Sequence, residues 1–471
     1  MTTPMMTLAQ AAKWLPAATL LGDGNLQLAR VHTDTRTVQP GDLFVALKGE
    51  KFDGNQFLAQ AKNRGAVAAV CCSREALDHS GMAGLIVPDT REALAGLAAA
   101  WRAQFSLPLI AVTGSNGKTT VTQMIAAVLF AHAPEEMLAT EGNFNNDIGV
   151  PLTLLRLRQH HRIAVVELGM NHPGEIASLA NMAKPTIALV NNAQREHLEF
   201  MATVEAVARE NGAVFSALPG SGIAVFPKHD AHSGLWHDVS APRACLTFAD
   251  DLQQDGADVQ GTSAMWRGDA WQVEVKSPAG LLAFKLRIAG RHNVTNALAA
   301  IACTLAAGVS VPAIVQGMEK FEPVRGRSRS VIGFVGGHRF TVIDDTYNAN
   351  PDSVKAAINV LASLPAPRML VLGDMGEVGE NGPEFHAEAG AIAKAAGIDS
   401  LYTLGELSAR ASKEFGAGRH FSDVDSLNEA LLGVAKDYNS VLVKGSRFMR
   451  MERVVSALQE VEVKKTEAAC S

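Results

Sequence analysis

Residues 109–120, with the sequence LIAVTGSNGKTT, place an apolar segment directly before a glycine-containing turn and a lysine–threonine pair. An apolar run of this length, followed by glycine and then by an amphipathic segment, predicts a buried strand that turns into a helix. Gly114 and Gly117 allow a tight turn whose backbone N–H groups point at an anion, and the positive N-terminal end of the helix adds to that attraction. The segment therefore predicts a strand–loop–helix unit that binds nucleotide phosphates.

The side chains of this loop suit the same chemistry. Lys118 can reach the terminal phosphates of a nucleotide, and the hydroxyl of Thr119 can bind Mg²⁺. The pattern is the short form G-x-x-G-K-T, because Val112 stands where the longer phosphate-loop pattern has its first glycine. An ordinary strand-to-helix turn with a solvated lysine is the alternative, and the strand before and the helix after favour the phosphate loop.

Length and composition limit the remaining possibilities. A chain of 471 residues predicts about three domains, and its 47% apolar residues can build large cores. The formal net charge is −6 and the lysines and arginines are scattered, which argues against nucleic acid as the main partner. Neither a basic signal-peptide segment nor an uninterrupted apolar stretch long enough for a bilayer occurs, so we expect no membrane insertion.

The cysteines point to a reducing, cytoplasmic location. The chain has five, at positions 71, 72, 245, 303 and 470, with no C-x-x-C pair and no histidine spacing suited to zinc. Cys71 and Cys72 end an apolar strand pattern, and Cys303 lies in an alanine-rich helical pattern. We therefore expect these three to be buried as small apolar side chains.

The apolar segments predict an α/β fold with three domains. Residues 1–104 form a small mixed α/β domain, in which the capping pair Thr7 and Gln10 opens a helix and residues 41–48 are the clearest strand. Residues 105–322 and 323–471 each alternate strands with helices, which predicts a central, mainly parallel sheet of the phosphate-loop type and a C-terminal doubly wound, Rossmann-like domain. The central strands are expected at 109–113, 163–168, 186–191 and 222–226, with an antiparallel addition within 265–288 and a helix at 293–307, and the C-terminal strands at 340–343, 368–372, 401–404 and 441–443.

Candidate functional side chains follow consecutive strands of the central sheet. Glu167 ends one strand and His197 follows the next, so both fall at the carboxyl edge where ligands of open α/β sheets bind. A carboxylate there can hold Mg²⁺ beside the phosphate loop. Taken singly, a strand-end glutamate is usually solvated and a lone histidine usually structural, and their position together favours function.

Other polar groups permit two interpretations each. Asn293 suits a ligand contact or simply the N-cap of the helix that follows. Arg327 begins the third domain and could neutralise a transferring phosphate or be a surface arginine, and Asp345 could bind a ribose or belong to a simple turn. In the first domain the polar turns 33–36 and 48–54 could bind sugar or phosphate, or be solvated loops.

Taken in order, these segments resemble the motifs of the Mur ligase family. The resemblance covers essentially the whole chain and is carried by residues 113–120, 142–151, 167–175, 197–199, 290–293, 344–350, 372–377 and 444–447. Residues 142–151 (GNFNNDIGVP) and 372–377 (LGDMGE) are the most characteristic of one branch of that family.

The resemblance implies a three-domain ligase of peptidoglycan precursor synthesis. Members of that branch join D-alanyl-D-alanine to a UDP-N-acetylmuramoyl tripeptide while ATP is hydrolysed to ADP and phosphate, so ATP and Mg²⁺ are the implied cofactors. The first domain would bind the UDP substrate, and the third would help bind ATP and the dipeptide. The active site would then assemble by domain closure in a protein that we expect to be monomeric.

The resemblance also implies roles for individual residues. The catalytic group would be Lys118, Glu167, His197 and Arg327, and the metal ligands Thr119, Glu167 and His197. The ATP contacts would be Gly114, Ser115, Asn116, Gly117, Lys118, Thr119, Thr120, Asn293, Asn296, Arg327 and Asp345. The contacts to the UDP substrate would be Asp34, Arg36, Lys48, Asp53, Asn143 and Asn146.

One position departs from the family pattern. Many Mur ligases have a carbamylated lysine that helps hold a second Mg²⁺, and the matching residue here is Asn211, with no lysine between Lys184 and Lys228. An amide cannot form a carbamate, although its oxygen or the neighbouring Glu210 could still serve the metal. We therefore expect activity that is independent of bicarbonate and needs relatively high Mg²⁺.

Two alternatives remain at this level. Another amide ligase of the superfamily, such as a folylpolyglutamate synthase, would share the phosphate loop, but the motifs of the first domain argue against it. A nucleotide-dependent binding or motor module would share the loop and lack ligase chemistry. A ligase would release phosphate only when it is given both an acceptor carboxylate and an amine.

Overall fold

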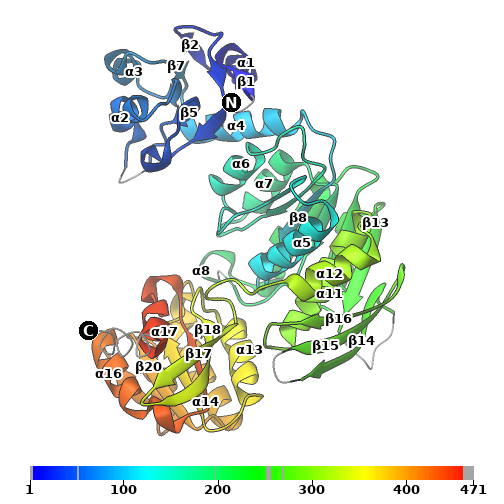
Figure 1. Ribbon diagram of the computed structural model, residues 1–471, viewed down its shortest axis with the longest axis vertical. Coiled ribbons are helices and arrows are strands. Elements are labelled where there is room, and N and C mark those ends of the chain that lie inside the picture. Colours follow the sequence, from blue (N-terminus) through cyan, green and yellow to red (C-terminus); the bar gives the residue numbers. More distant parts are fainter. Residues whose placement is uncertain (1–3, 50–51, 197, 251–255, 268–269, 460–471) are drawn as a thin grey trace, which may run out of the picture.

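The computed structural model describes residues 4–49, 52–196, 198–250, 256–267 and 270–459, and three α/β units follow one another along the chain (Figure 1). Each unit has its own larger sheet, of five, nine and six strands. The N-terminal and C-terminal units lie at opposite ends of the central unit (Figure 1). This arrangement is the α/β fold that the sequence predicts.

The N-terminal unit is built on a mostly parallel sheet in the order β2-β7-β6-β5-β4. Thr7 caps the first helix by accepting a hydrogen bond from the backbone N of Gln10 at 3.1 Å, as predicted. The strands are β2 (Thr19–Leu21), β4 (Arg30–His32), β5 (Asp42–Val45), β6 (Ala68–Cys71) and β7 (Ala83–Ile86), with the pair β1 (Met6–Thr7) and β3 (Gln27–Leu28) beside them. The helices are α1 (Leu8–Trp14), α2 (Leu58–Asn63), α3 (Arg74–Ser80) and α4 (Thr90–Arg102).

The central unit has a nine-stranded sheet in the order β16-β15-β14-β13-β12-β11-β8-β10-β9. Strand β14 pairs with β13 in parallel and with β15 in antiparallel fashion, so the predicted antiparallel addition is present and begins at Val259. The strands are β8 (Leu109–Thr113), β9 (Met137–Ala139), β10 (Ile163–Glu167), β11 (Ile187–Val190), β12 (Ile223–Pro227), β13 (Ala244–Ala249), β14 (Val259–Trp266), β15 (Trp271–Ser277) and β16 (Gly280–Leu286). The helices are α5 (Lys118–His132), α6 (Gly149–Leu154), α7 (Glu175–Ala183), α8 (Leu198–Met201), α9 (Val204–Gly212), α10 (Ser233–Ser240), α11 (His292–Ala306) and α12 (Val311–Lys320).

Strand β8 shows why the central sheet is covered on both faces. Leu109 and Ala111 belong to one hydrophobic core, and Ile110 and Val112 belong to another, because successive side chains point to opposite faces. The first of these cores continues into the N-terminal unit, and Trp101 of α4 donates a hydrogen bond from Nε1 to the carbonyl of residue 157 at 3.1 Å. The first two units therefore share one core.

The C-terminal unit has a six-stranded sheet in the order β17-β18-β22-β19-β20-β21, with a hydrophobic core on each face. It is parallel except at its edge, where β17 runs antiparallel to β18. The strands are β17 (Arg329–Val335), β18 (His338–Asp345), β19 (Arg368–Gly373), β20 (Ser400–Leu404), β21 (Arg419–Phe421) and β22 (Ser440–Lys444). The helices are α13 (Pro351–Ala362), α14 (Gly382–Ala395), α15 (Ala409–Phe415), α16 (Val424–Val434) and α17 (Glu452–Gln459). The four predicted strands are present, and the edge strands β17 and β21 were not predicted.

The fold bears on the cysteines and on membrane insertion. Cys71 and Cys303 are buried as expected, but the expectation is wrong for Cys72, which is only half-buried. Cys72 lies just beyond the end of β6, and Asn55 Nδ2 donates to its Sγ at 3.3 Å. Within the described ranges, no helix combines the length and the apolar character needed to cross a membrane.

Candidate active site

The phosphate loop leaves β8 at Thr113 and turns through Gly114, with φ of 130°, and Gly117, with φ of 84°. Both angles lie in the left-handed region that favours glycine. A Cβ added at Gly117 would lie 2.5 Å from Oδ1 of Asn296, so contact also excludes a side chain there. The tight glycine turn expected from the sequence is therefore present.

The backbone N–H groups of the loop are less exposed than expected. The N–H of Gly114 donates to Oδ1 of Asn211 at 3.0 Å, and those of Ser115 and Asn116 donate to the carbonyl and Oδ1 of Asn192 at 3.1 and 2.8 Å. The expectation of a bare N–H group at Gly114 is therefore wrong. The donors left for an anion are those in the first turn of α5, which have no acceptor within the helix.

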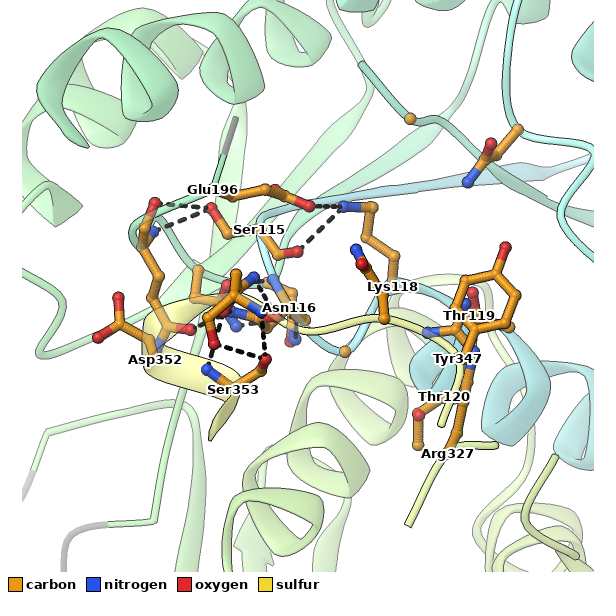
Figure 2. Close-up of a pocket in the computed structure, with 18 of the residues that line it drawn as sticks. Ser115, Asn116, Lys118, Thr119, Thr120, Glu196, Arg327, Tyr347, Asp352 and Ser353 are labelled. Carbon is orange, nitrogen blue, oxygen red and sulfur yellow. Dashed lines mark hydrogen bonds and ion pairs between the residues drawn. The ribbon is translucent and has the colours of Figure 1, made fainter. Parts of the chain in front are cut away.

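Lys118 points along the loop and toward a carboxylate (Figure 2). Its Nζ donates to the carbonyl of Gly114 at 2.6 Å and to Oε1 of Glu196 at 2.9 Å. The two side chains of this ion pair are only 14% and 8% exposed. Glu196 was not singled out from the sequence, although it directly precedes the predicted His197.

Glu167 stands at the end of β10, beside the loop. Its Oε1 accepts hydrogen bonds from Oγ1 of Thr119 at 3.1 Å and from Nδ2 of Asn145 at 2.7 Å. Its Oε2 is buried and has no hydrogen-bond partner among the described residues. Carboxylate and hydroxyl oxygens are hard ligands, so this pair fits Mg²⁺. The third predicted ligand, His197, lies outside the described residues.

A chain of amides connects α11 to the loop. Asn296 donates from Nδ2 to Oδ1 of Asn293 at 2.9 Å, and its own Oδ1 accepts from Nδ2 of Asn191 at 2.9 Å. Asn191 Nδ2 also donates to the carbonyl of Asn116 at 2.8 Å. Asn293 lies inside the helix, which begins at His292, and donates to the carbonyl of residue 289, so the N-cap interpretation is wrong.

The C-terminal unit contributes further polar and charged residues to the site. The guanidinium of Arg327 stacks on the ring of Tyr347, 4.0 Å from its centroid, which is a cation–π contact. Asp345 accepts the backbone N–H of Ser328 at 2.9 Å and pairs with Nζ of Lys444 at 2.6 Å. Both predicted residues are thus held in place by their own unit.

These groups line one cleft of about 1070 Å³ between the central and C-terminal units. The predicted residues that line it are Ser115, Asn116, Gly117, Lys118, Thr119, Thr120, Asn143, Asn146, Glu167, Asn293, Asn296, Arg327 and Asp345. It is also lined by residues outside the predicted set of site residues, namely Asn145, Asn191, Asn192, Glu196, Tyr347 and Lys444. The cleft therefore gathers polar groups from segments far apart in the chain.

The residues predicted for the N-terminal unit do not line this cleft. Asp34 pairs with Arg36 at 2.7 Å, and the hydrogen bonds from that arginine lower the pKa of Asp34 to about 2. Lys48 and Asp53 face each other at 4.0 Å across an isolated antiparallel bridge. Any substrate that reaches both regions must therefore be long.

Asn211, which matches the position of the carbamylated lysine of many Mur ligases, holds the phosphate loop in this structure. Asn211 is fully buried, and its Oδ1 accepts hydrogen bonds from Oγ1 of Thr113 at 2.7 Å and from Gly114. Glu210 accepts the backbone N–H groups of Gly174 and Ile176 at 2.8 and 2.9 Å, at the start of α7. Neither residue lines the cleft, so the idea that either serves the metal is not supported.

Three family models and several known proteins match this chain. The sequence matches the Mur ligase family catalytic domain over residues 27–102, the Mur ligase middle domain over 112–304 and the Mur ligase glutamate ligase domain over 330–447. It is 40% identical over 442 residues to the UDP-N-acetylmuramoyl-tripeptide–D-alanyl-D-alanine ligase of Escherichia coli. The aligned region covers 93% of this chain and 96% of that protein. The chain belongs to the Mur ligase family.

Solved Mur ligases have the same fold over nearly their whole length. MurF from Acinetobacter baumannii superposes with a TM-score of 0.88 at 32% identity, covering 97% of this chain and 99% of that one. MurF from Thermotoga maritima, solved in complex with ADP, gives 0.80 at 26% identity over 93% of this chain and 98% of that one. The family resemblance and the α/β fold class expected from the sequence are confirmed.

Proposed function

We propose that this Mur ligase joins D-alanyl-D-alanine to a UDP-N-acetylmuramoyl tripeptide, with hydrolysis of ATP to ADP and phosphate, in peptidoglycan precursor synthesis. The observation that carries the proposal is the 40% identity to the E. coli ligase of that name over almost the full length of both chains. The cleft supports it, because a phosphate loop and a second domain face the same space.

The residues suit a reaction through an acyl phosphate. The tripeptide carboxylate attacks the γ-phosphorus of ATP, and ADP leaves. The amine of the dipeptide then attacks the acyl carbon, phosphate leaves with the bonding electrons, and the amine loses a proton. Negative charge gathers in both steps, and Lys118 with the first-turn N–H groups of α5 would stabilise it.

The metal would be held at the end of β10. Glu167 offers a buried carboxylate oxygen, Thr119 offers a hydroxyl beside it, and His197 is proposed as a third ligand. When bound, Mg²⁺ would neutralise charge on the phosphates. Asn145 orients Glu167 by donating to its other oxygen.

The remaining roles are proposed from the family pattern. Residues 1–104 would bind the UDP end through Asp34, Arg36, Lys48 and Asp53, residues 105–322 would bind ATP, and residues 323–471 would bind ATP and the dipeptide. Asn143 and Asn146 line the cleft and would contact the tripeptide substrate. Asn293 and Asn296 would lie near adenine, Arg327 near phosphate and Asp345 near ribose. We propose a cytoplasmic monomer.

A phosphate-release assay tests the function. The protein is given ATP, Mg²⁺ and a UDP-tripeptide with diaminopimelate or lysine at its third position, with and without D-alanyl-D-alanine. We expect release only in the complete mixture, and a product heavier by the dipeptide less one water in mass spectrometry. Phosphate release without the dipeptide, or none with either tripeptide, would overturn the proposal.

A further inference from the structure

Three consecutive residues, Gln194, Arg195 and Glu196, lie between the phosphate loop and the C-terminal unit, and we call them the bridging segment. Gln194 fastens it to the loop, because its backbone N–H donates to Oγ of Ser115 at 2.9 Å and its Oε1 accepts from Nδ2 of Asn116 at 2.6 Å. The segment follows β11 and is not part of a helix or a strand. Its three side chains contact different partners: Gln194 contacts the loop, Arg195 the C-terminal unit and Glu196 Lys118.

Arg195 fastens the segment to the C-terminal unit. Its guanidinium donates to Oδ1 of Asp352 at 2.7 Å and to Oε2 of Glu388 at 2.8 Å, and its backbone N–H donates to Oδ2 of Asp352 at 2.9 Å. The two carboxylates belong to different helices, α13 and α14. A guanidinium held by two carboxylates has a defined orientation, unlike a single surface ion pair.

Glu196 connects the segment to Lys118. Its Oε1 is 2.9 Å from Lys118 Nζ in a pair that is largely shielded from solvent, and Figure 2 shows the two side chains facing each other. The N-terminal end of α13 also touches the loop, because its N-cap residue Asn350 donates from Nδ2 to Oδ1 of Asn116 at 3.0 Å. Figure 2 shows Asp352 and Ser353, in the first turn of α13, on the Asn116 side of the loop.

We propose that Arg195 is a positioning residue that couples docking of the C-terminal unit to the orientation of Lys118. Arg195 and Glu196 are adjacent along a backbone that Gln194 fixes to the loop, so a shift of α13 or α14 moves the carboxylate that holds Lys118. The lysine is then aligned for phosphate only when the C-terminal unit is docked. This proposal rests on the proposed function for its kinetic test, and on geometry for a second test.

The kinetic test compares Arg195→Gln with Arg209→Gln, which removes a charge from an exposed ion pair with Glu205 on α9. We expect Arg195→Gln to lower kcat for phosphate release about tenfold while KM for ATP changes less than threefold, and Arg209→Gln to change neither. Arg195→Lys should recover part of kcat. An unchanged kcat in Arg195→Gln, or an equal loss in Arg209→Gln, would overturn the proposal.

The second test does not need activity. The rate at which an amine-reactive reagent acetylates Lys118 is followed by mass spectrometry in the full chain. We expect Arg195→Gln and Asp352→Asn, which acts on Arg195 from α13, to raise that rate severalfold, because Lys118 loses its fixed partner. Arg209→Gln should leave the rate unchanged. Equal labelling of Lys118 in all variants would overturn the coupling. If the variants show this labelling pattern but the wild-type protein does not ligate, only the proposed function is overturned.

Discussion

Lys118 is the cation that we propose faces the transferred phosphate, and its contacts show what its removal would change. Its Nζ donates to two loop carbonyls and to Glu196, and removing it ends those three contacts. The backbone N–H groups of the turn are held separately by Asn211 and Asn192, so we expect the turn itself to remain. We expect Lys118→Ala to lower the rate of phosphate release by a factor on the order of a hundred or more. The measurement is steady-state turnover with circular dichroism as the check of folding, and the exposed Lys276→Ala serves as the control. Near-normal turnover in a folded variant would contradict the role of the loop.

Asn211 allows a second prediction at this scale. Its amide oxygen satisfies the Thr113 hydroxyl and the Gly114 N–H, and the site is closed to solvent. Activity should therefore be the same in bicarbonate-free and bicarbonate-supplemented buffer. Asn211→Ala leaves two buried donors unsatisfied and should cost about 1–3 kcal/mol of stability. Asn211→Lys, which from the sequence alone could lower the Mg²⁺ requirement, should instead be destabilising, because it buries a charge.

A bicarbonate titration and thermal unfolding of the two variants check this prediction. Loss of activity on CO₂ depletion, restored by bicarbonate, would show that a carbamate forms on another lysine. A stable and active Asn211→Lys variant would show that the loop does not depend on this amide.

At the scale of helices and strands, local sequence pattern was sufficient to predict much of the fold. The run 109–120 predicted β8, its glycine turn and the start of α5, because apolar periodicity and glycine positions are local properties. The strand β17 was missed, since an edge strand is fixed by its pairing with β18 rather than by its own pattern. Contacts such as Asn145 with Glu167 join separate segments, and no spacing in the sequence signals them.

Helix α14 carries a prediction about pH. His386 is fully buried, and its Nε2 accepts the backbone N–H of Met375 at 2.9 Å, so the neutral ring is required. Burial lowers its pKa from 6.5, and the hydrogen bond to the Gly382 carbonyl and the charge of Asp374 offset this only in part. The unfolded chain then binds a proton that the folded chain does not, so this stabilisation is complete above pH 6.5 and is lost as pH falls below it.

The slope expected from one such group is at most about 1.4 kcal/mol per pH unit. We expect the stability of His386→Gln to fall less between about pH 7.5 and pH 5.5 than that of the wild type. Thermal unfolding of both proteins across this range measures the difference. The difference between the two proteins removes the contributions of other histidines. Identical pH profiles would contradict a neutral, buried His386.

At the scale of the whole molecule, the three α/β units were foreseen from length and alternation, but their contacts were not. The Arg195 pairing with Asp352 joins residues 157 positions apart, and nothing in either local pattern predicts it. The proposed UDP contacts lie in a different region from the cleft that holds Lys118, which requires a substrate that spans two units. Under the proposed function, the arrangement of the units is therefore itself part of the active site.

The last prediction concerns that arrangement in solution. Arg327 and Asp345 belong to the C-terminal unit and Lys118 to the central unit, yet all three line the same cleft of about 1070 Å³. A nucleotide in the cleft would contact charged groups from both units, so binding should favour the conformation in which they are close. We expect small-angle scattering to show a smaller radius of gyration when a non-hydrolysable ATP analogue and the UDP-tripeptide are both present than for the free protein. Asp352→Asn should weaken that change, because it removes the carboxylate that Arg195 holds most closely. An unchanged radius at saturating ligand would show that the units are already fixed in their working positions before substrate binds.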